Sequence, residues 1–326
     1  MEQITRSVLA RLFFAETTRV SCRNPRITIH IRKMWQLAAS DTHVVHPMKL
    51  DNFYTQLFFC TARIEVQLSA VESSVGSGFL LQVPIDANHG ALLLVSNRHV
   101  LLAGGPVANV TFHKGDGAGE ARRPRLVEVQ TCRLDTTAVA CHPDPAVDLA
   151  CVNVSPIGNP DLALYYRHLD PSLMADFEEP WIGPFTEVCF VGYPDGRHDT
   201  HNHLPILRSG RIASIPSTDF NGANQLVIDA HVHRGSSGSP VFAIPPPFSG
   251  GTPRFIGVLT QTMIRGENLV TVATVPSVAV PLTIGLGLVL KPSLVKHLIS
   301  TAIAKVTPPA QSLTSEHDSS QMPKVA

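Results

Sequence analysis

From Phe53 onward the chain is built of short apolar runs separated by glycine and proline turns. Some runs alternate apolar and polar residues and others are continuously apolar, and both patterns are typical of β-strands at this length. Runs in the first half cover Phe58 to Leu68, Gly78 to Val83, Ala91 to Val95 and Val107 to Phe112, with two more within Ala138 to Val154. The pattern therefore predicts about six strands in this half.

A second series of runs follows a proline-rich connector, Ser155 to Pro184, in which Pro171 to Glu178 has the pattern of a short helix. These runs are Thr186 to Val191, Ile206 to Ile215, Gln225 to Ala230, Pro240 to Ala243, Arg254 to Met263, Leu269 to Val275 and Thr283 to Leu290. Pro292 to Ala304 then places apolar residues at helical spacing, with proline in the first turn. This order predicts a second group of strands and a closing helix.

The expected architecture is all-β: two six-stranded antiparallel β-barrels with a C-terminal helix. We expect the first barrel over residues 48–165 and the second, with its helix, over 166–305. Residues 306–326 are polar and rich in proline and serine, which predicts a disordered tail. Residues 1–47 hold seven basic and three acidic residues without a clear period. We interpret them as a dispensable extension: a targeting or pro-segment, a disordered arm, or translated sequence upstream of Met34 or Met48.

Charge and composition exclude several classes of function. Lys and Arg total 26, as do Asp and Glu, so the chain offers no net charge for binding nucleic acid or an anionic membrane. No apolar run is long enough to span a membrane, and Leu12 to Ala15 is too short for a signal-peptide core. The six cysteines form no CxxC pair, which argues against a zinc ribbon or a redox motif and favours free thiols in a cytoplasmic protein.

Three polar segments stand out within this apolar pattern: Ser96 to Val100 displays His99, Val147 to Leu149 embeds Asp148, and Gly235 to Pro240 forms a small-residue turn. Taken singly they could be a structural histidine, a turn cap and a linker. An acyl-transfer nucleophile, however, needs a serine on a glycine turn, an imidazole to accept its proton, and a carboxylate to orient the imidazole. The chain supplies these groups in the order His, Asp, Ser, with the serine in the second half.

Further short motifs carry a family resemblance. Gly76 to Phe79 matches the GSGF strand of the family, Ser96 to Val100 its TNxHV signature, Asp148 to Ala150 its DLA motif and Gly235 to Pro240 its GNSGSP turn. Phe190 to Pro194 resembles the GYP strand that opens the second barrel, and Leu286 to Pro292 the strand before the closing helix. Over residues 53–303 the chain resembles the trypsin-like (chymotrypsin-fold) serine peptidases. It is most similar to their bacterial branch, with HtrA-like and glutamyl-endopeptidase-like enzymes.

The resemblance implies a serine endopeptidase that acts on protein or peptide substrates through an acyl-enzyme, without a cofactor. Ser237 would be the nucleophile, His99 the general base and then acid, and Asp148 the orienting carboxylate; the N–H groups of Gly235 and Ser237 would form the oxyanion hole. Ser236 stands where the family has Asp or Asn, so we expect no activation by a new N-terminus. The alternative is a catalytically silent or latent peptide-binding module that uses the same cleft. The oligomeric state is left open.

By the same resemblance the substrate pocket would include His231, Val232, His233, Leu259 and Thr260. None of these is a carboxylate, so a preference for Lys or Arg is not expected. Leu259 stands where glutamyl-specific relatives carry histidine, which leaves a small or medium apolar residue as the expected preference.

Clustered histidines offer a competing site. His198, His201, His203, His231 and His233 have HxxH and HxH spacings that can surround zinc, and Asp199 could join them. No thiolate accompanies them in a ligand pattern, so we expect no metal.

Overall fold

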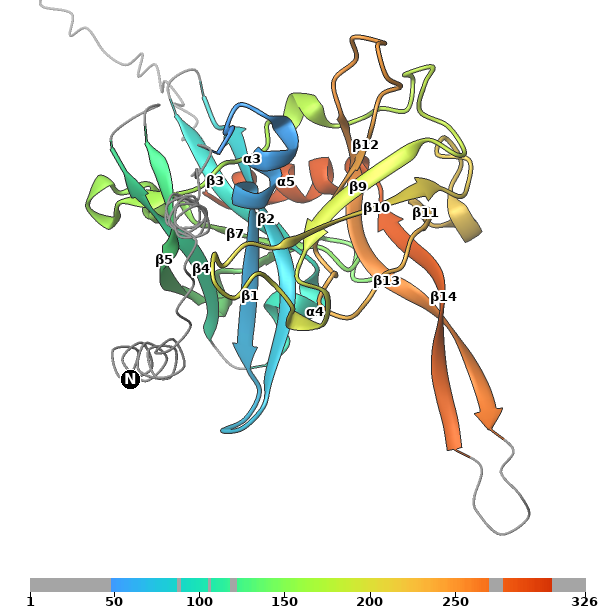
Figure 1. The fold of residues 1–326 in the computed structure, drawn as a ribbon, viewed down its shortest axis with the longest axis horizontal. Coiled ribbons are helices and arrows are strands. Elements are labelled where there is room, and N and C mark those ends of the chain that lie inside the picture. The colour runs from blue at the N-terminus through green and yellow to red at the C-terminus, as the bar shows by residue number, and fades with distance from the viewer. Residues whose placement is uncertain (1–47, 87–88, 105–106, 118–121, 270–277, 307–326) are drawn as a thin grey trace, which may run out of the picture. The chain divides into compact units, whose positions relative to one another are not determined.

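This computed structural model describes residues 48–306 except 87–88, 105–106, 118–121 and 270–277 (Figure 1). Strands make up most of its regular secondary structure. The first half has the helices α3 (Phe53–Cys60) and α4 (Arg98–Leu101). Its strands are β1 (Thr61–Gln67), β2 (Ser73–Pro84), β3 (Gly90–Ser96), β4 (Val107–Asp116), β5 (Arg123–Asp135), β6 (Ala140–Cys141), β7 (Ala150–Asn153) and β8 (Leu164–Tyr165). The second half has β9 (Glu187–Gly192), β10 (Ile206–Ile212), β11 (Gln225–Asp229), β12 (Pro240–Ala243), β13 (Arg254–Leu269), β14 (Val278–Leu290) and the closing helix α5 (Pro292–Val306).

The second half forms a closed barrel of six strands in the order β10-β11-β14-β13-β12-β9. Every pair in it is antiparallel. The prediction of a six-stranded barrel is therefore confirmed for this half.

In the first half the described strands form an eight-stranded sheet that does not close. The strand order is β5-β4-β1-β2-β3-β7-β6, and β8 pairs with β4. The two edge strands, β5 and β6, are consecutive in the chain and are separated by the 3-10 turn Thr136–Ala138. The side chain of Asp135 caps this turn by accepting from the Thr137 N–H. The expected closed six-stranded barrel is therefore not confirmed for this half, whose described sheet is open between β5 and β6.

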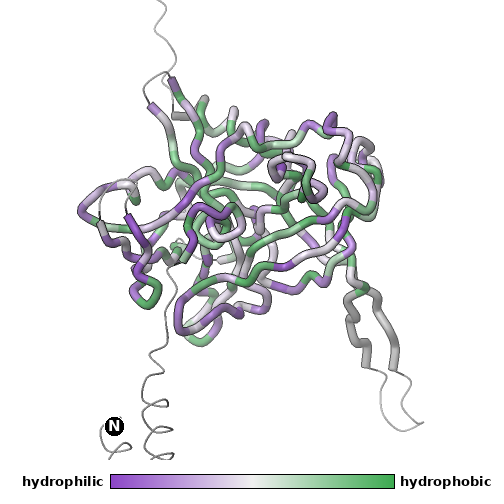
Figure 2. Tube along the Cα trace, turned by 45° about the horizontal axis from the view of Figure 1, so that its top comes forward, coloured by the Kyte–Doolittle hydropathy of each residue, from purple (hydrophilic) through white to green (hydrophobic). Residues whose placement is uncertain are grey.

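A shared apolar core joins the two halves. Phe79 and Leu93 of the first half, Phe242 and Val258 of the second, and Leu298 of α5 all belong to one buried cluster. Apolar residues follow the central strands in Figure 2, while polar residues concentrate in the connections. Helix α5 buries the face predicted from its spacing, and this face links the barrel to the open sheet.

Several local predictions are corrected. Phe58 to Cys60 end helix α3 rather than beginning a strand, because the Asn52 side chain accepts from the N–H groups of Tyr54 and Thr55 and starts a helix. The helix predicted over Pro171 to Glu178 is only a 3-10 turn, Pro171–Leu173. The chain leaves this turn at Met174, which bridges to Phe255 of the barrel.

Other predictions lie where the structure describes little or nothing. The extension 1–47 and nearly all of the tail 306–326 fall outside the described residues, and so does the predicted strand Leu269 to Val275 beyond its first residue. Strand β5 was not expected at all from the sequence. Among the described residues, no helix is both long enough and apolar enough to cross a membrane.

Candidate active site

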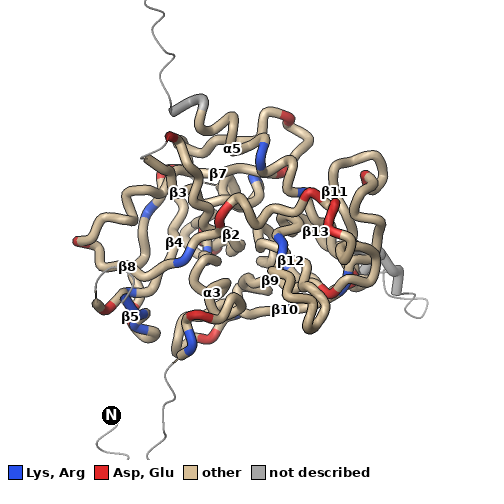
Figure 3. Tube along the Cα trace, turned by 90° about the horizontal axis from the view of Figure 1, so that it is seen from above, with Lys and Arg blue, Asp and Glu red and all other residues tan. Residues whose placement is uncertain are grey.

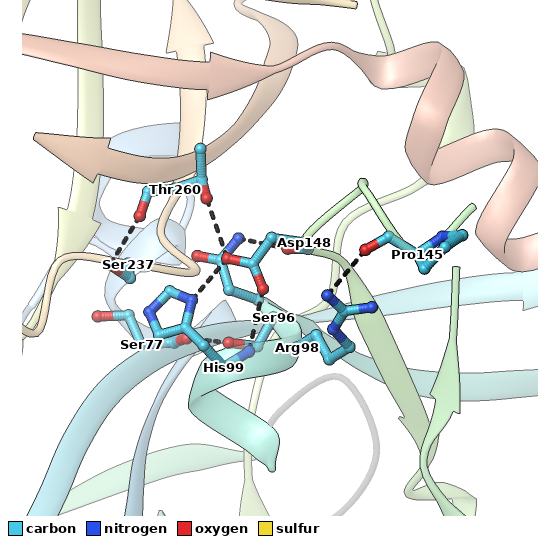
Figure 4. A network of polar contacts seen from close by, with 9 residues as sticks. Ser77, Ser96, Arg98, His99, Pro145, Asp148, Ser237 and Thr260 are labelled. Carbon is cyan, nitrogen blue, oxygen red and sulfur yellow. Dashed lines mark hydrogen bonds and ion pairs between the residues drawn. The ribbon is translucent and has the colours of Figure 1, made fainter. Parts of the chain in front are cut away.

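His99 lies on α4, the single helical turn that follows β3 (Figure 4). Asn97 caps this turn in extended backbone conformation, and its buried side chain donates a hydrogen bond of 2.8 Å to the Asp148 carbonyl oxygen. Ser96, also buried, donates to the Ser77 carbonyl oxygen on β2. The turn that displays His99 is thus tied on one side to β2 and on the other to the segment that carries Asp148.

Asp148 precedes β7 and receives three hydrogen bonds. Its Oδ2 accepts from His99 Nδ1 at 2.5 Å and from Thr260 Oγ1 at 3.2 Å, and its Oδ1 accepts from the His99 N–H at 3.0 Å. Burial of the carboxyl raises the pKa of Asp148, but the hydrogen bonds from His99 and Thr260 lower it by more, so the pKa lies below its ordinary value. The ionised carboxylate therefore holds the proton of His99 on Nδ1 and leaves Nε2 as the proton acceptor.

Ser237 lies in a turn whose backbone requires glycine at two positions. Gly235 has φ +79° and Gly238 has φ +87°, both in the left-handed region that L-residues rarely adopt. A Cβ on Gly238 would also collide with the Ser77 carbonyl oxygen. Ser77 fixes the turn further, because its N–H donates to the Ser237 carbonyl oxygen at 2.9 Å and its Oγ donates to that of Gly235 at 2.7 Å.

The hydroxyl of Ser237 donates to the Thr260 carbonyl oxygen at 3.0 Å rather than to His99 (Figure 4). Ser237 and His99 nevertheless line one open cavity of about 590 Å³. The His–Asp pair is therefore hydrogen-bonded in this structure, while the Ser–His contact needs a rotation of the serine side chain. Catalytic hydrogen bonds are often formed only once substrate is bound.

Two backbone N–H groups beside the Ser237 hydroxyl have no hydrogen-bond acceptor among the described residues. Across the part of the chain that the structure describes, the backbone N–H groups of Gly235 and Ser237 donate no hydrogen bond, whereas that of Ser236 donates to the His233 carbonyl oxygen. Two free N–H groups flanking a hydroxyl can bind an oxygen that develops negative charge. The Ser236 side chain is buried, and its Oγ has no partner among the described residues.

The five expected pocket residues do not form one pocket. Val232 and Leu259 are buried in the core of the second barrel, His231 is exposed, and His233 lies beside a separate cavity. Thr260 alone reaches the site, where its side chain contacts Asp148 and its carbonyl oxygen contacts Ser237. None of these five residues lines the cavity that contains His99 and Ser237.

Sequence reasoning missed two residues that organise the site, Ser77 and Asn97. Both lie inside motifs that were singled out for their neighbours. In the sequence, each is a polar residue within an apolar strand or at its end. Such a side chain must find a hydrogen-bond partner when it is buried, and this could have identified both residues.

The clustered histidines do not converge on a metal. His198 and His203 stack with ring centroids 6.3 Å apart, and His233 Nδ1 lies 3.6 Å from Asp195 Oδ2. Within the described ranges, no group of three or more His, Cys, Asp or Glu side chains is placed to hold a metal ion.

Comparison with known proteins identifies the family to which the chain belongs. The model of the trypsin-like peptidase domain matches residues 76–244, more than half of the chain. None of the curated proteins matches the chain.

Among solved structures, the chain is similar to the serine endoprotease from Yersinia pestis at 14% identity and a TM-score of 0.45, over 80% of this chain and 69% of that one. It is similar to human heparin binding protein at 13% identity and a TM-score of 0.43, over 77% and 94% of the two chains. For a protease from M. tuberculosis in its active form, the values are 19% identity, a TM-score of 0.39, and 78% and 86% coverage. By its family match, this chain belongs to the trypsin-like peptidases and is a hydrolase of the serine endopeptidase type.

Proposed function

We propose that the chain hydrolyses peptide bonds through an acyl-enzyme on Ser237, with His99 as the proton carrier and Asp148 as the orienting carboxylate. The observation that carries this proposal is the 2.5 Å hydrogen bond from His99 Nδ1 to Asp148 Oδ2, made by a histidine that lines the same cavity as Ser237. A carboxylate in this position stabilises the imidazolium that forms during the reaction.

The reaction begins when the Ser237 side chain turns from Thr260 toward His99. Ser237 Oγ then attacks the substrate carbonyl carbon as its proton passes to His99 Nε2, and the N–H groups of Gly235 and Ser237 bind the oxyanion. His99 next gives that proton to the leaving amine, and the C–N bond breaks. Water attacks the resulting ester while His99 accepts its proton, the C–Oγ bond breaks, and Ser237 regains the proton.

A free strand edge beside Ser237 offers a place for the acyl part of the substrate. Strand β12 pairs with β13 only as far as Val258, and the Thr260 carbonyl oxygen faces Ser237. From Thr260 to Met263, the edge of β13 on this side has no strand partner in the described chain. An extended peptide can pair with such an edge through backbone hydrogen bonds.

The site also supports the proposed division of the chain. His99 and Asp148 belong to the segment 48–165, and Ser237 and Thr260 to the segment 166–305. We propose that the first segment is a six-stranded barrel whose fifth strand is split into β5 and β6 by the turn Thr136–Ala138. Residues 1–47 and 306–326 would then be accessory to both barrels.

Labelling with a fluorophosphonate probe tests the mechanism directly, because the probe phosphonylates only an activated serine. We expect wild-type protein to be labelled, and Ser237→Ala and His99→Ala to lose labelling while remaining folded by circular dichroism. Ser236→Ala is the matched control, since it removes the neighbouring hydroxyl and leaves Ser237 in place. Absence of labelling in folded wild-type protein, or labelling that persists in Ser237→Ala, would contradict the proposal.

A latent peptide-binding module is the second candidate, and the hydrogen bond from Ser237 to the Thr260 carbonyl oxygen favours it. In this case folded wild-type protein is not labelled alone but binds peptides in the same cleft. Labelling that appears only after a peptide is added would identify the latent form.

A further inference from the structure

We propose that Arg197, Arg208 and Arg234 form a basic surface that binds acidic residues on the leaving-group side of a polypeptide substrate. This inference deepens the proposed peptidase function and rests on it for the direction in which the substrate lies. It adds a substrate preference that neither the motifs nor the family match assigns.

The three arginines line two adjoining cavities beside the nucleophile turn. Arg234 directly precedes Gly235, is exposed, and lines the cavity that contains His99 and Ser237. Arg197 and Arg208 line a second open cavity of about 660 Å³. Asp195 lines both cavities, so the two adjoin at this residue, and together they are called the recess below.

Backbone contacts hold this recess against the nucleophile turn. The Asp195 N–H donates to the Arg234 carbonyl oxygen at 2.5 Å, and the Arg197 N–H donates to that of Pro194 at 2.8 Å. The segment that carries Arg197 is therefore fixed beside the turn that carries Ser237.

Charge in the recess is unbalanced. Within the described part of the chain, none of the three arginine side chains forms an ion pair or a hydrogen bond with another residue. Asp195, the acidic residue lining the second cavity, lies 3.6 Å from His233 Nδ1. Glu72 lines the first cavity. When it is counted together with Asp195, the three arginines still leave the recess with a net positive charge. Figure 3 shows both signs of charge scattered over the rest of the fold, in keeping with zero net charge.

The direction of the substrate follows from the free edge of β13. If the acyl part pairs with Thr260 to Met263, the residues after the scissile bond leave Ser237 on the opposite side. The first cavity lies there, because its lining includes Gly235 and the β1–β2 turn at Glu72 but no residue of β13. Carboxylates on that part of the substrate would face unpaired guanidinium groups, which favour planar oxyanions.

A binding experiment on the full chain with Ser237→Ala tests the surface without needing turnover. The probes are two fluorescein-labelled peptide mixtures, each with four randomised residues followed by either three glutamates or three lysines. We expect the glutamate mixture to bind about 10-fold more tightly, measured by fluorescence anisotropy at about 50 mM salt. The preference should shrink at about 0.5 M salt, because exposed charges are then screened.

Charge reversal supplies the matched variants. Arg197→Glu, Arg208→Glu and Arg234→Glu combined should abolish or invert the preference, whereas Arg133→Glu, exposed on β5, should leave it unchanged. Equal affinity for the two mixtures, no measurable binding of either, or a preference that survives the triple change would overturn the inference.

Fluorophosphonate labelling separates this outcome from failure of the proposed function. The wild-type chain, in which the surface and Ser237 are both intact, should be labelled. A labelled enzyme without the acidic preference would refute the arginine surface alone, whereas an acidic preference in an unlabelled protein would refute the peptidase mechanism alone.

Discussion

Thr260 makes hydrogen bonds with both Asp148 and Ser237, and so connects the two halves of the site. Its side chain donates to the Asp148 carboxylate, and its carbonyl oxygen accepts from the Ser237 hydroxyl. One residue of the second half thereby supports the orienting carboxylate of the first half and holds the nucleophile in its resting rotamer. We therefore treat Thr260 as a positioning residue.

Replacing Thr260 with valine tests this role, because it removes the hydroxyl and keeps the carbonyl oxygen. We expect the rate of fluorophosphonate labelling to fall about 5-fold, since one hydrogen bond contributes roughly 1 kcal/mol. In the profile of unfolding free energy against pH, the loss of stability at acid pH should begin at a higher pH, because a hydrogen bond that lowers the pKa of Asp148 is lost. Thr260→Ser should restore both. An unchanged pH profile in Thr260→Val would argue for a merely structural threonine.

The lowered pKa of Asp148 also predicts how stability depends on pH. A carboxyl whose pKa is lower in the folded than in the unfolded state stabilises the fold above its ordinary value of 3.8, and this stabilisation is lost as pH falls through the folded pKa. Asp148→Asn should therefore reduce the free energy of unfolding by about 1–3 kcal/mol at pH 7. The difference between variant and wild type should narrow below about pH 4. Urea unfolding at pH 7 and pH 3 measures both; a difference that is constant with pH would contradict this account.

At the scale of elements, the turn from Gly235 to Ser239 is positioned by strands on both sides. Ser77 of β2 contacts it from the first half, while the Gly238 N–H donates to the Leu259 carbonyl oxygen on β13. The turn therefore takes its shape from tertiary contacts as well as from its two glycines.

Alanine substitutions at Gly222 and Gly238 distinguish the effect of backbone conformation from the effect of tertiary contacts. Gly222 and Gly238 both have positive φ, but a Cβ on Gly222 meets open space, whereas one on Gly238 meets the Ser77 carbonyl oxygen. We expect Gly222→Ala to cost about 1–2 kcal/mol of unfolding free energy and to keep labelling. Gly238→Ala should cost roughly 3 kcal/mol or more and abolish labelling. Denaturant unfolding compares the two variants, and equal costs would show that backbone strain alone matters.

Edge elements were the hardest to predict. Strand β5 alternates in burial, but its polar and charged side chains leave few continuous apolar positions, and the strand lies at the edge of the sheet. Its inward residues, such as Cys132 and Leu134, pack against a second buried cluster, made of first-half residues such as Ile64 and Val110, and do not reach full burial. A hydrophobic pattern is therefore weak where a strand has a neighbour on only one side.

At the scale of the whole molecule, the described fold has its own core. Among the described residues, the three buried clusters lie between Leu57 and Ala302, and we predict that this core is sufficient for folding. Removing residues 1–47 should therefore leave the melting temperature within about 2 °C of the full chain and leave labelling intact. Calorimetry of the full chain and of the truncated chain measures the two melting temperatures. A loss of more than about 10 °C would show that the extension is part of the fold.

The sequence by itself determined the strand-rich fold, the closing helix and the three segments that carry His99, Asp148 and Ser237. These features are local, because turn glycines, apolar periodicity and short motifs act over a few neighbouring residues.

Only the tertiary structure decided which strands close into a barrel, that Ser77 and Thr260 hold the turn of Ser237, and that Val232 and Leu259 belong to the core rather than to a pocket. Each of these depends on contacts between residues far apart in the chain, such as Ser77 and Gly235 or Asp148 and Thr260. Burial and hydrogen-bond partners of this kind arise only when distant strands meet.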